Sequence, residues 1–221
     1  MLKRVAFFAQ KQVRLVTTAS IMVLALSSGN LSAQQEFGYP DGVPPLPSTI
    51  AVPEGFKMFF SGHALGTQNY MCLPTASGLA WKFIAPQATL FDSVNGELGQ
   101  QLTTHFLSAN VEEGGLLRPT WQHSLDSSRV WGRLAAPPLI DANFVEAGAI
   151  PWLLLEKAGV DAGPTGGSFL TRTRYIQRLN TSGGAAPSTG CSQPAEIGTV
   201  AFVPYTADYF FYKAVGRPSE P

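Results

Sequence analysis

The sequence is short of charge and of the residues that most enzymes use. Charged side chains make up 14% of its 221 residues, against about 25% in average proteins. It has two cysteines and three histidines, and it contains none of the common nucleotide-binding, zinc-protease or serine-hydrolase motifs. Little charge, combined with 22 glycines and 17 prolines, argues against a helical bundle or a disordered tail and is typical of a turn-rich all-β domain.

The sequence also lacks an apolar run long enough to span a bilayer. The run from Leu15 to Leu26 is too short for that, but it follows four basic residues and precedes a small-residue cleavage site that ends at Ala33. We therefore expect residues 1–33 to be a signal peptide, residues 34–53 a proline-rich extended segment, and residues 54–215 a single all-β domain. The alternative is an uncleaved membrane anchor.

Removal of the leader changes the charge balance of the chain. The leader holds 4 of the 15 basic residues and none of the 15 acidic ones, so the mature chain has a net charge of 11 − 15 = −4. This balance argues against nucleic acid as a partner. We expect an exported protein, periplasmic or extracellular, with no membrane span after cleavage.

The two cysteines, Cys72 and Cys191, both lie in the expected mature chain. An exported chain meets oxidising conditions, so one intramolecular disulfide is expected. The alternatives are two buried free thiols or a metal pair, for which no third ligand lies nearby in the sequence.

Short apolar and aromatic runs separated by turn residues predict a β-sandwich or a closed β-barrel with long loops. Residues Asp141 to Gly148 fit one or two helical turns, and Trp152 to Glu156 fit either a strand or a short helix. The expected strands before this point are Phe56 to Phe60, Gln68 to Leu73, Leu79 to Ala85, Ala88 to Asp92, Gln101 to Leu107, Thr120 to Ser124 and Arg129 to Leu134.

Two further strands are expected near the C-terminus. In the run from Phe169 to Leu179, alternation places Arg172, Arg174 and Arg178 on one basic face. We expect this face to meet solvent or an anionic ligand. The run from Tyr205 to Tyr212 carries aromatic residues on both faces, which predicts a strand inside the sheet.

Asp208 lies among these aromatic residues and needs a hydrogen-bond donor if it is buried. One of the three arginines of the basic face is the expected partner. A structural ion pair is the favoured interpretation.

The candidate ligand-binding site consists of His105, Trp121, His123 and Asp126. Trp121 and His123 share a face of their strand, His105 lies on a neighbouring strand, and Asp126 follows in the next turn. Imidazole and carboxylate groups suit a metal, and a tryptophan ring suits a sugar face. The alternative is structural: Asp126 closes a turn, Trp121 belongs to the core, and the histidines are edge residues.

A family resemblance is carried by five runs: NYMCLPTASGLAWKFIAPQATLFD, RPTWQHSLDSSRVWG, IPWLLLEKAG, YIQRLNTSGGAAPSTGC and VPYTADYFFYK. From about Pro53 to Lys213 the chain resembles a family of secreted bacterial and fungal proteins known only as domain of unknown function 3455. The resemblance implies export and the cysteine pair. It transfers no catalytic residue.

These observations favour a non-catalytic protein that binds a small molecule or glycan and needs no cofactor. One alternative is a hydrolytic or metal-dependent enzyme that uses His105, His123 and Asp126. Another is a structural protein of the cell envelope.

Overall fold

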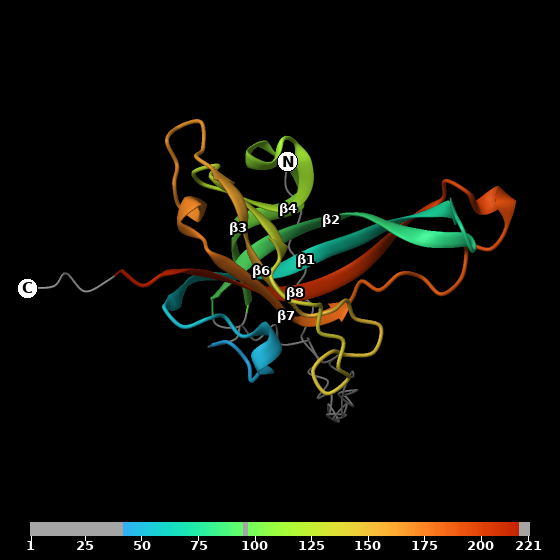
Figure 1. Ribbon diagram of the computed structural model, residues 1–221, viewed down its shortest axis with the longest axis horizontal. Coiled ribbons are helices and arrows are strands. Elements are labelled where there is room, and N and C mark those ends of the chain that lie inside the picture. The colour runs from blue at the N-terminus through green and yellow to red at the C-terminus, as the bar shows by residue number, and fades with distance from the viewer. Residues whose placement is uncertain (1–41, 95–96, 217–221) are drawn as a thin grey trace, which may run out of the picture. The chain divides into compact units, whose positions relative to one another are not determined.

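The computed structural model describes residues 42–94 and 97–216, so the expected signal peptide and the start of the proline-rich segment lie outside the described residues. Eight antiparallel strands form a closed barrel in which each strand pairs with the next and β8 pairs with β1 (Figure 1). The strands are β1 Phe56–Thr75, β2 Gly78–Val94, β3 Glu97–Asn110, β4 Leu116–His123, β5 Arg129–Leu134, β6 Leu153–Asp161, β7 Tyr175–Gly183 and β8 Val200–Ala214.

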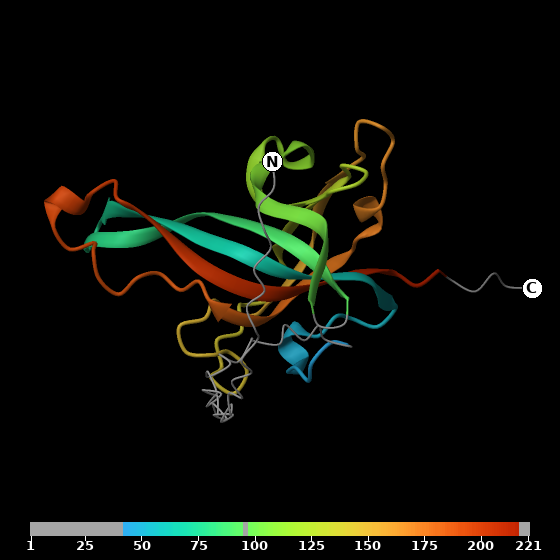
Figure 2. The ribbon, with the colours of Figure 1, turned by 180° about the vertical axis from the view of Figure 1, so that it is seen from behind.

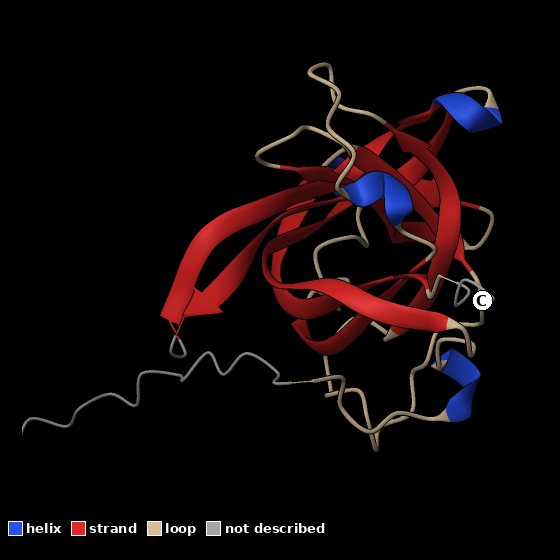
Figure 3. Cartoon of the chain, turned by 90° about the vertical axis from the view of Figure 1, so that its left-hand side faces the viewer, coloured by secondary structure: helices blue, strands red, loops and turns tan. Residues whose placement is uncertain are grey.

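The predicted all-β class is confirmed, and of the two architectures expected the structure has the closed barrel. Within residues 42–94 and 97–216, the helical segments are four 3-10 turns: η1 Ser48–Ile50, η2 Val111–Glu113, η3 Leu170–Arg172 and η4 Pro194–Glu196. In Figure 3 the strands curve around a common interior. Within the described part of the chain, no helix has the length and hydropathy needed to cross a membrane.

Alternating side chains fill the barrel interior. In β8, Tyr205, Ala207, Tyr209 and Phe211 point inward and join a buried cluster with Trp121. An eight-stranded barrel is just wide enough to be filled by side chains or to hold one small ligand. The prediction that this C-terminal strand lies inside the sheet is confirmed, because β8 pairs with both β1 and β7.

A second buried cluster covers the outside of the barrel over β6, β7 and β8. It includes Ile50 from η1, Val145 from the β5–β6 connection, and Leu179 and Phe210 from the strands. Gln177 also faces this layer, and its Nε2 donates to the carbonyl oxygen of Ile50. The aromatic residues on both faces of β8 therefore serve two separate cores.

Beyond the barrel, β1, β2 and β8 continue as a three-stranded ribbon. Pairing of β1 with β2 runs to Thr75, whereas β3 pairs with β2 no further than Ala88 (Figures 1 and 2). The Cys72–Cys191 disulfide joins this ribbon to the β7–β8 connection. It closes a loop of 119 residues, for which chain entropy gives a stabilisation of about 4 to 5 kcal/mol.

The structure corrects part of the expected secondary structure. Residues 169–174 were expected to begin a strand, but β7 begins at Tyr175 and the residues before it form η3 and a loop. Asp141 accepts a hydrogen bond from the backbone of Asn143 in a turn that does not continue as a helix. Of the two interpretations offered for the run around Leu153, the strand is the right one.

Candidate functional site

A pocket of about 390 Å³ opens at the end of the barrel from which the ribbon extends. Its volume lies at the lower end of the range found for small-molecule sites. The lining is mainly apolar and aromatic and comes from all eight strands and the β5–β6 connection: Gln68, Tyr70, Phe83, Pro86, His105, Arg118, Pro119, Trp121, Gly132, Arg133, Leu134, Pro138, Ile150, Pro151, Leu153, Leu155, Arg178 and Tyr209.

An aromatic wall forms one side of this pocket. The rings of His105 and Trp121 stack with centroids 4.3 Å apart, and the ring of Tyr209 contacts both at 5.3 and 5.5 Å. The Nδ1 atom of His105 lies 2.9 Å from the carbonyl oxygen of Thr120. A carbonyl can only accept, so Nδ1 carries the proton and Nε2 of the neutral ring is unprotonated.

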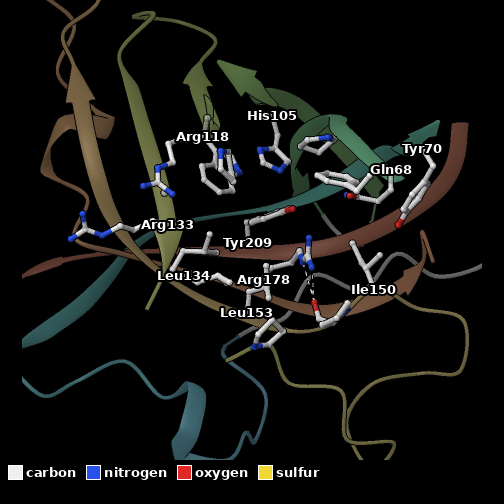
Figure 4. Close-up of a pocket in the computed structure, with 18 residues that line it drawn as sticks. Gln68, Tyr70, His105, Arg118, Arg133, Leu134, Ile150, Leu153, Arg178 and Tyr209 are labelled. Atoms are coloured by element: carbon white, nitrogen blue, oxygen red, sulfur yellow. Dashed lines mark hydrogen bonds between the residues drawn. The ribbon is translucent and has the colours of Figure 1, made fainter. Parts of the chain in front are cut away.

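Arg178 brings a positive charge into the barrel. Alternation along β7 turns Ile176 and Arg178 inward, whereas Gln177 and Leu179 face the outer cluster. The Nε and Nη2 atoms of Arg178 donate to the carbonyl oxygen of Pro151 at 3.1 and 2.8 Å, as Figure 4 shows. No carboxylate within residues 42–94 and 97–216 forms an ion pair with it.

The two other arginines of the pocket are neutralised. Arg118 holds Glu113 through two hydrogen bonds of 2.8 and 2.7 Å, and Arg133 pairs with Glu156 at 2.8 Å. The Arg118 hydrogen bond holds the pKa of Glu113 down to about 2. Arg178 is therefore the one pocket arginine without a carboxylate partner among the described residues.

The titratable groups around Arg178 are neutral near pH 7. Burial lowers the pKa of His105 to about 3; its hydrogen bond to Thr120 opposes this shift, and the charge of Arg178 adds to it. Burial raises the pKa of Tyr209, against the opposing effect of Arg178. Burial also raises the pKa of Tyr205 well above its usual value. The pocket thus has one uncompensated positive charge.

Two buried donors of the pocket lack hydrogen-bond partners. Nε2 of Gln68 and Nε1 of Trp121 make no hydrogen bond with the described residues, and both side chains are almost fully buried. The Gln68 amide lies near the Tyr205 hydroxyl, but its nitrogen is outside ordinary hydrogen-bond geometry. Buried donors are normally paired, so these two are available to a bound molecule.

The structure places the four sequence-predicted site residues at two ends of the interior. His105 and Trp121 line the pocket. His123 and Asp126 lie at the opposite end, where the ring of Phe169 stacks on His123 at 4.5 Å. We call this the closed end, defined by His123, Asp126, Ser128, Phe169 and Leu170.

Asp126 organises the closed end through hydrogen bonds. Its Oδ1 accepts from the backbone nitrogen and hydroxyl of Ser128 at 3.0 and 2.7 Å, and lies 3.0 Å from Nδ1 of His123. Its Oδ2 accepts from the backbone nitrogen of Phe169 at 2.8 Å. Burial opposes ionisation of Asp126, but these hydrogen bonds outweigh it and hold the pKa well below its usual range. This geometry fixes the loop before β7 over the barrel end.

Asp208 has partners other than those expected. Nδ1 of His63 lies 2.7 Å from its Oδ1, and Nδ2 of Asn180 donates to its Oδ2 at 2.8 Å. The expected arginine partner is therefore wrong, because Arg178 points into the barrel while Asp208 faces outward. Within residues 42–94 and 97–216, no three His, Cys, Asp or Glu side chains are grouped so as to hold a metal ion.

The site prediction from the sequence did not include Arg178, Tyr209 or Gln68. A signal for Arg178 was present: alternation placed it on a basic face expected to meet solvent or an anionic ligand. Tyr209 and Gln68 carry no local signal, because only closure of the barrel brings β1, β7 and β8 together.

Fold and site together define an eight-stranded antiparallel barrel with a ligand-sized pocket in one mouth. The chain belongs to the family described as "Protein of unknown function (DUF3455)", whose sequence model matches residues 53–213. The family resemblance expected from the sequence is confirmed over this range. Comparison with curated proteins and with solved structures gives no match.

Proposed function

We propose that this protein is an exported, non-catalytic protein that binds a small, largely apolar molecule in the pocket at the ribbon end of the barrel. The observation that carries this proposal is the pocket itself: about 390 Å³ lined mainly by apolar and aromatic side chains, with a few buried polar groups. Ligand sites have this composition. Export is supported by the Cys72–Cys191 disulfide and by the basic, apolar leader.

The polarity of the pocket favours a small apolar molecule over a glycan. A sugar presents hydroxyl groups on every edge, and each needs a polar partner when it is buried. Few of the pocket residues can provide one, because Arg118 and Arg133 are engaged by Glu113 and Glu156.

The chemistry of the histidines favours binding over hydrolysis. A general base works best when its pKa is close to the working pH, and burial lowers that of His105 to about 3. The other histidine of the enzymatic alternative, His123, lies against Phe169 and Asp126 at the closed end.

Titration with an uncharged apolar dye, N-phenyl-1-naphthylamine, tests the proposal. The wild-type protein is expected to bind the dye with a stoichiometry of one and an increase in fluorescence. Leu153→Trp fills the pocket and is expected to abolish the increase. Leu117→Trp adds the same side chain at an exposed position away from the pocket and serves as the control. Equal binding by all three proteins would remove the pocket from consideration.

A further inference from the structure

We infer that the molecule bound in the pocket is a monoanion, an apolar skeleton with one carboxylate, and that Arg178 holds this carboxylate with help from the Gln68 amide. This inference rests on the proposed function and specifies its ligand class. It is carried by the placement of an arginine inside the barrel without a carboxylate partner among the described residues.

The position of Arg178 is fixed by its strand. Arg178 lies directly opposite Tyr209 in the pairing of β7 with β8, and both side chains line the pocket. Figure 4 shows Arg178 reaching toward Tyr209, with His105 and Gln68 on the far side of the same space. The guanidinium therefore faces the same space as the Tyr209 ring.

The hydrogen bonds of Arg178 leave donors free for a ligand. A guanidinium has five N–H donors in a planar fork. Pro151 accepts from Nε and Nη2, and the Tyr209 hydroxyl also interacts with the guanidinium, which leaves two N–H donors for a ligand. A fork of this kind matches the two oxygens of a carboxylate.

Gln68 adds an independent observation. It is 3% exposed and lines the same pocket, and its Nε2 has no hydrogen-bond partner among the described residues. A buried amide nitrogen without an acceptor is unfavourable. A carboxylate held by Arg178 provides an acceptor for this nitrogen.

The charge balance of the pocket points to a monoanion. Arg118 and Arg133 are paired with glutamates, so they do not add a second free positive charge. His105 and Tyr209 are neutral near pH 7. One uncompensated positive charge matches one negative charge, whereas a phosphate dianion would remain partly unpaired in a desolvated site.

Two pairs of probes separate the charge of a ligand from its skeleton: 2-naphthoate with 2-naphthalenemethanol, and octanoate with octanol. Calorimetry or displacement of N-phenyl-1-naphthylamine measures their affinity. We expect the wild-type protein to bind each acid about 10- to 100-fold more tightly than its alcohol, because hydrogen bonds to charged groups are strong. Arg178→Met is expected to remove this preference by weakening the acids while leaving the alcohols within about threefold.

Arg174→Met is the matched control, because it removes the same charge from an exposed position outside the pocket. It should keep the preference for acids. Arg178→Lys keeps the charge without the fork, so it is expected to retain part of the preference, and it keeps the test valid if Arg178→Met does not fold. Gln68→Leu is expected to weaken the acids by a smaller factor than Arg178→Met.

The outcomes distinguish the two proposals. Equal binding of acids and alcohols by wild type, unchanged in Arg178→Met, would overturn the carboxylate inference and leave the pocket function standing. Failure of the dye and all four probes to bind would overturn the proposed function itself. A third outcome is that Arg174→Met and Arg178→Met lose the preference for acids equally. That result would show that the preference comes from the overall charge of the protein, and it would reject Arg178 as the group that binds the carboxylate.

Discussion

The two ends of the barrel interior use similar residues in opposite ways. At the closed end, Asp126 is bonded to Ser128, Phe169 and His123, so its charge is fully engaged by the protein. At the pocket end, Arg178 has a backbone carbonyl and the neutral Tyr209 hydroxyl as its partners, and the amide nitrogen of Gln68 has no partner in the described chain. The carboxylate at one end is satisfied by hydrogen bonds within the fold, and the guanidinium at the other end has no carboxylate partner among the described residues.

This difference distinguishes polar side chains that stabilise the fold from polar side chains that can bind a ligand. His123 and His105 both stack on aromatic rings, so stacking alone does not identify a binding residue. The two ends differ in what surrounds the charged side chain. Asp126 is hydrogen-bonded to protein groups, whereas Arg178 lines the pocket. Buried polar groups are normally paired, but an unpaired atom alone does not identify a binding site, because Thr103 Oγ1 and Thr173 Oγ1 also lack partners in the described chain and lie outside the pocket.

The largest effect is expected from Asp126→Ala, which removes the charge that organises the closed end. The backbone nitrogens of Ser128 and Phe169 lose their acceptor, and unpaired buried donors are costly. We expect the free energy of unfolding to fall by about 3 kcal/mol, as measured by urea denaturation. Asp161→Ala removes an ion pair that is one third exposed and should cost less than about 1 kcal/mol. Equal losses would contradict a special role for Asp126.

A smaller effect is expected from the pH dependence of stability. The pKa of His105 falls to about 3 on folding, against about 6.5 in an unfolded chain. As the pH falls below 6.5, the unfolded state takes up a proton that the folded state does not, so stability is lost. The slope contributed is at most about 1.4 kcal/mol per pH unit.

His105→Phe keeps a ring at this position and removes the titration. Urea denaturation between pH 7.5 and 4.5 should therefore show a shallower loss of stability for the variant than for wild type. Asp126 does not interfere in this range, because a carboxylate with a depressed pKa loses its stabilising effect only as the pH falls below about 4. Identical slopes would show that His105 titrates normally and is not buried as described.

Much of the fold could be predicted from alternation and turn residues, but the strand lengths could not. Phe56 to Phe60 and Gln68 to Leu73 were expected as two strands, and both lie in the single strand β1. Gly66 lies between these two runs, within β1. In the structure it permits close packing, because a Cβ at this position would lie 2.5 Å from the Cα of Ala88.

The loop before β7 is a second feature that the sequence pattern did not predict. Its apolar and basic alternation from Phe169 onward fits a strand, yet Asp126 and Ser128 bind the backbone nitrogens of Phe169 and Leu170. These contacts join residues more than 40 positions apart, so no local pattern reveals them. The same loop places the ring of Phe169 on His123 at the closed end.

The smallest effect on stability is expected from Arg178→Met, and it tests the comparison most directly. The substitution removes hydrogen bonds to the Pro151 carbonyl, but it also removes a half-buried charge that has no carboxylate partner among the described residues. A methionine keeps the apolar contacts of the arginine stem and removes the cost of holding an unpaired charge partly away from water, so we expect the free energy of unfolding to change by less than about 1 kcal/mol. In the presence of 2-naphthoate, the melting temperature of wild type should rise and that of the variant should not. A loss of stability as large as that of Asp126→Ala, with no difference in the response to 2-naphthoate, would show that both charges are structural and that the two ends do not differ in the way described.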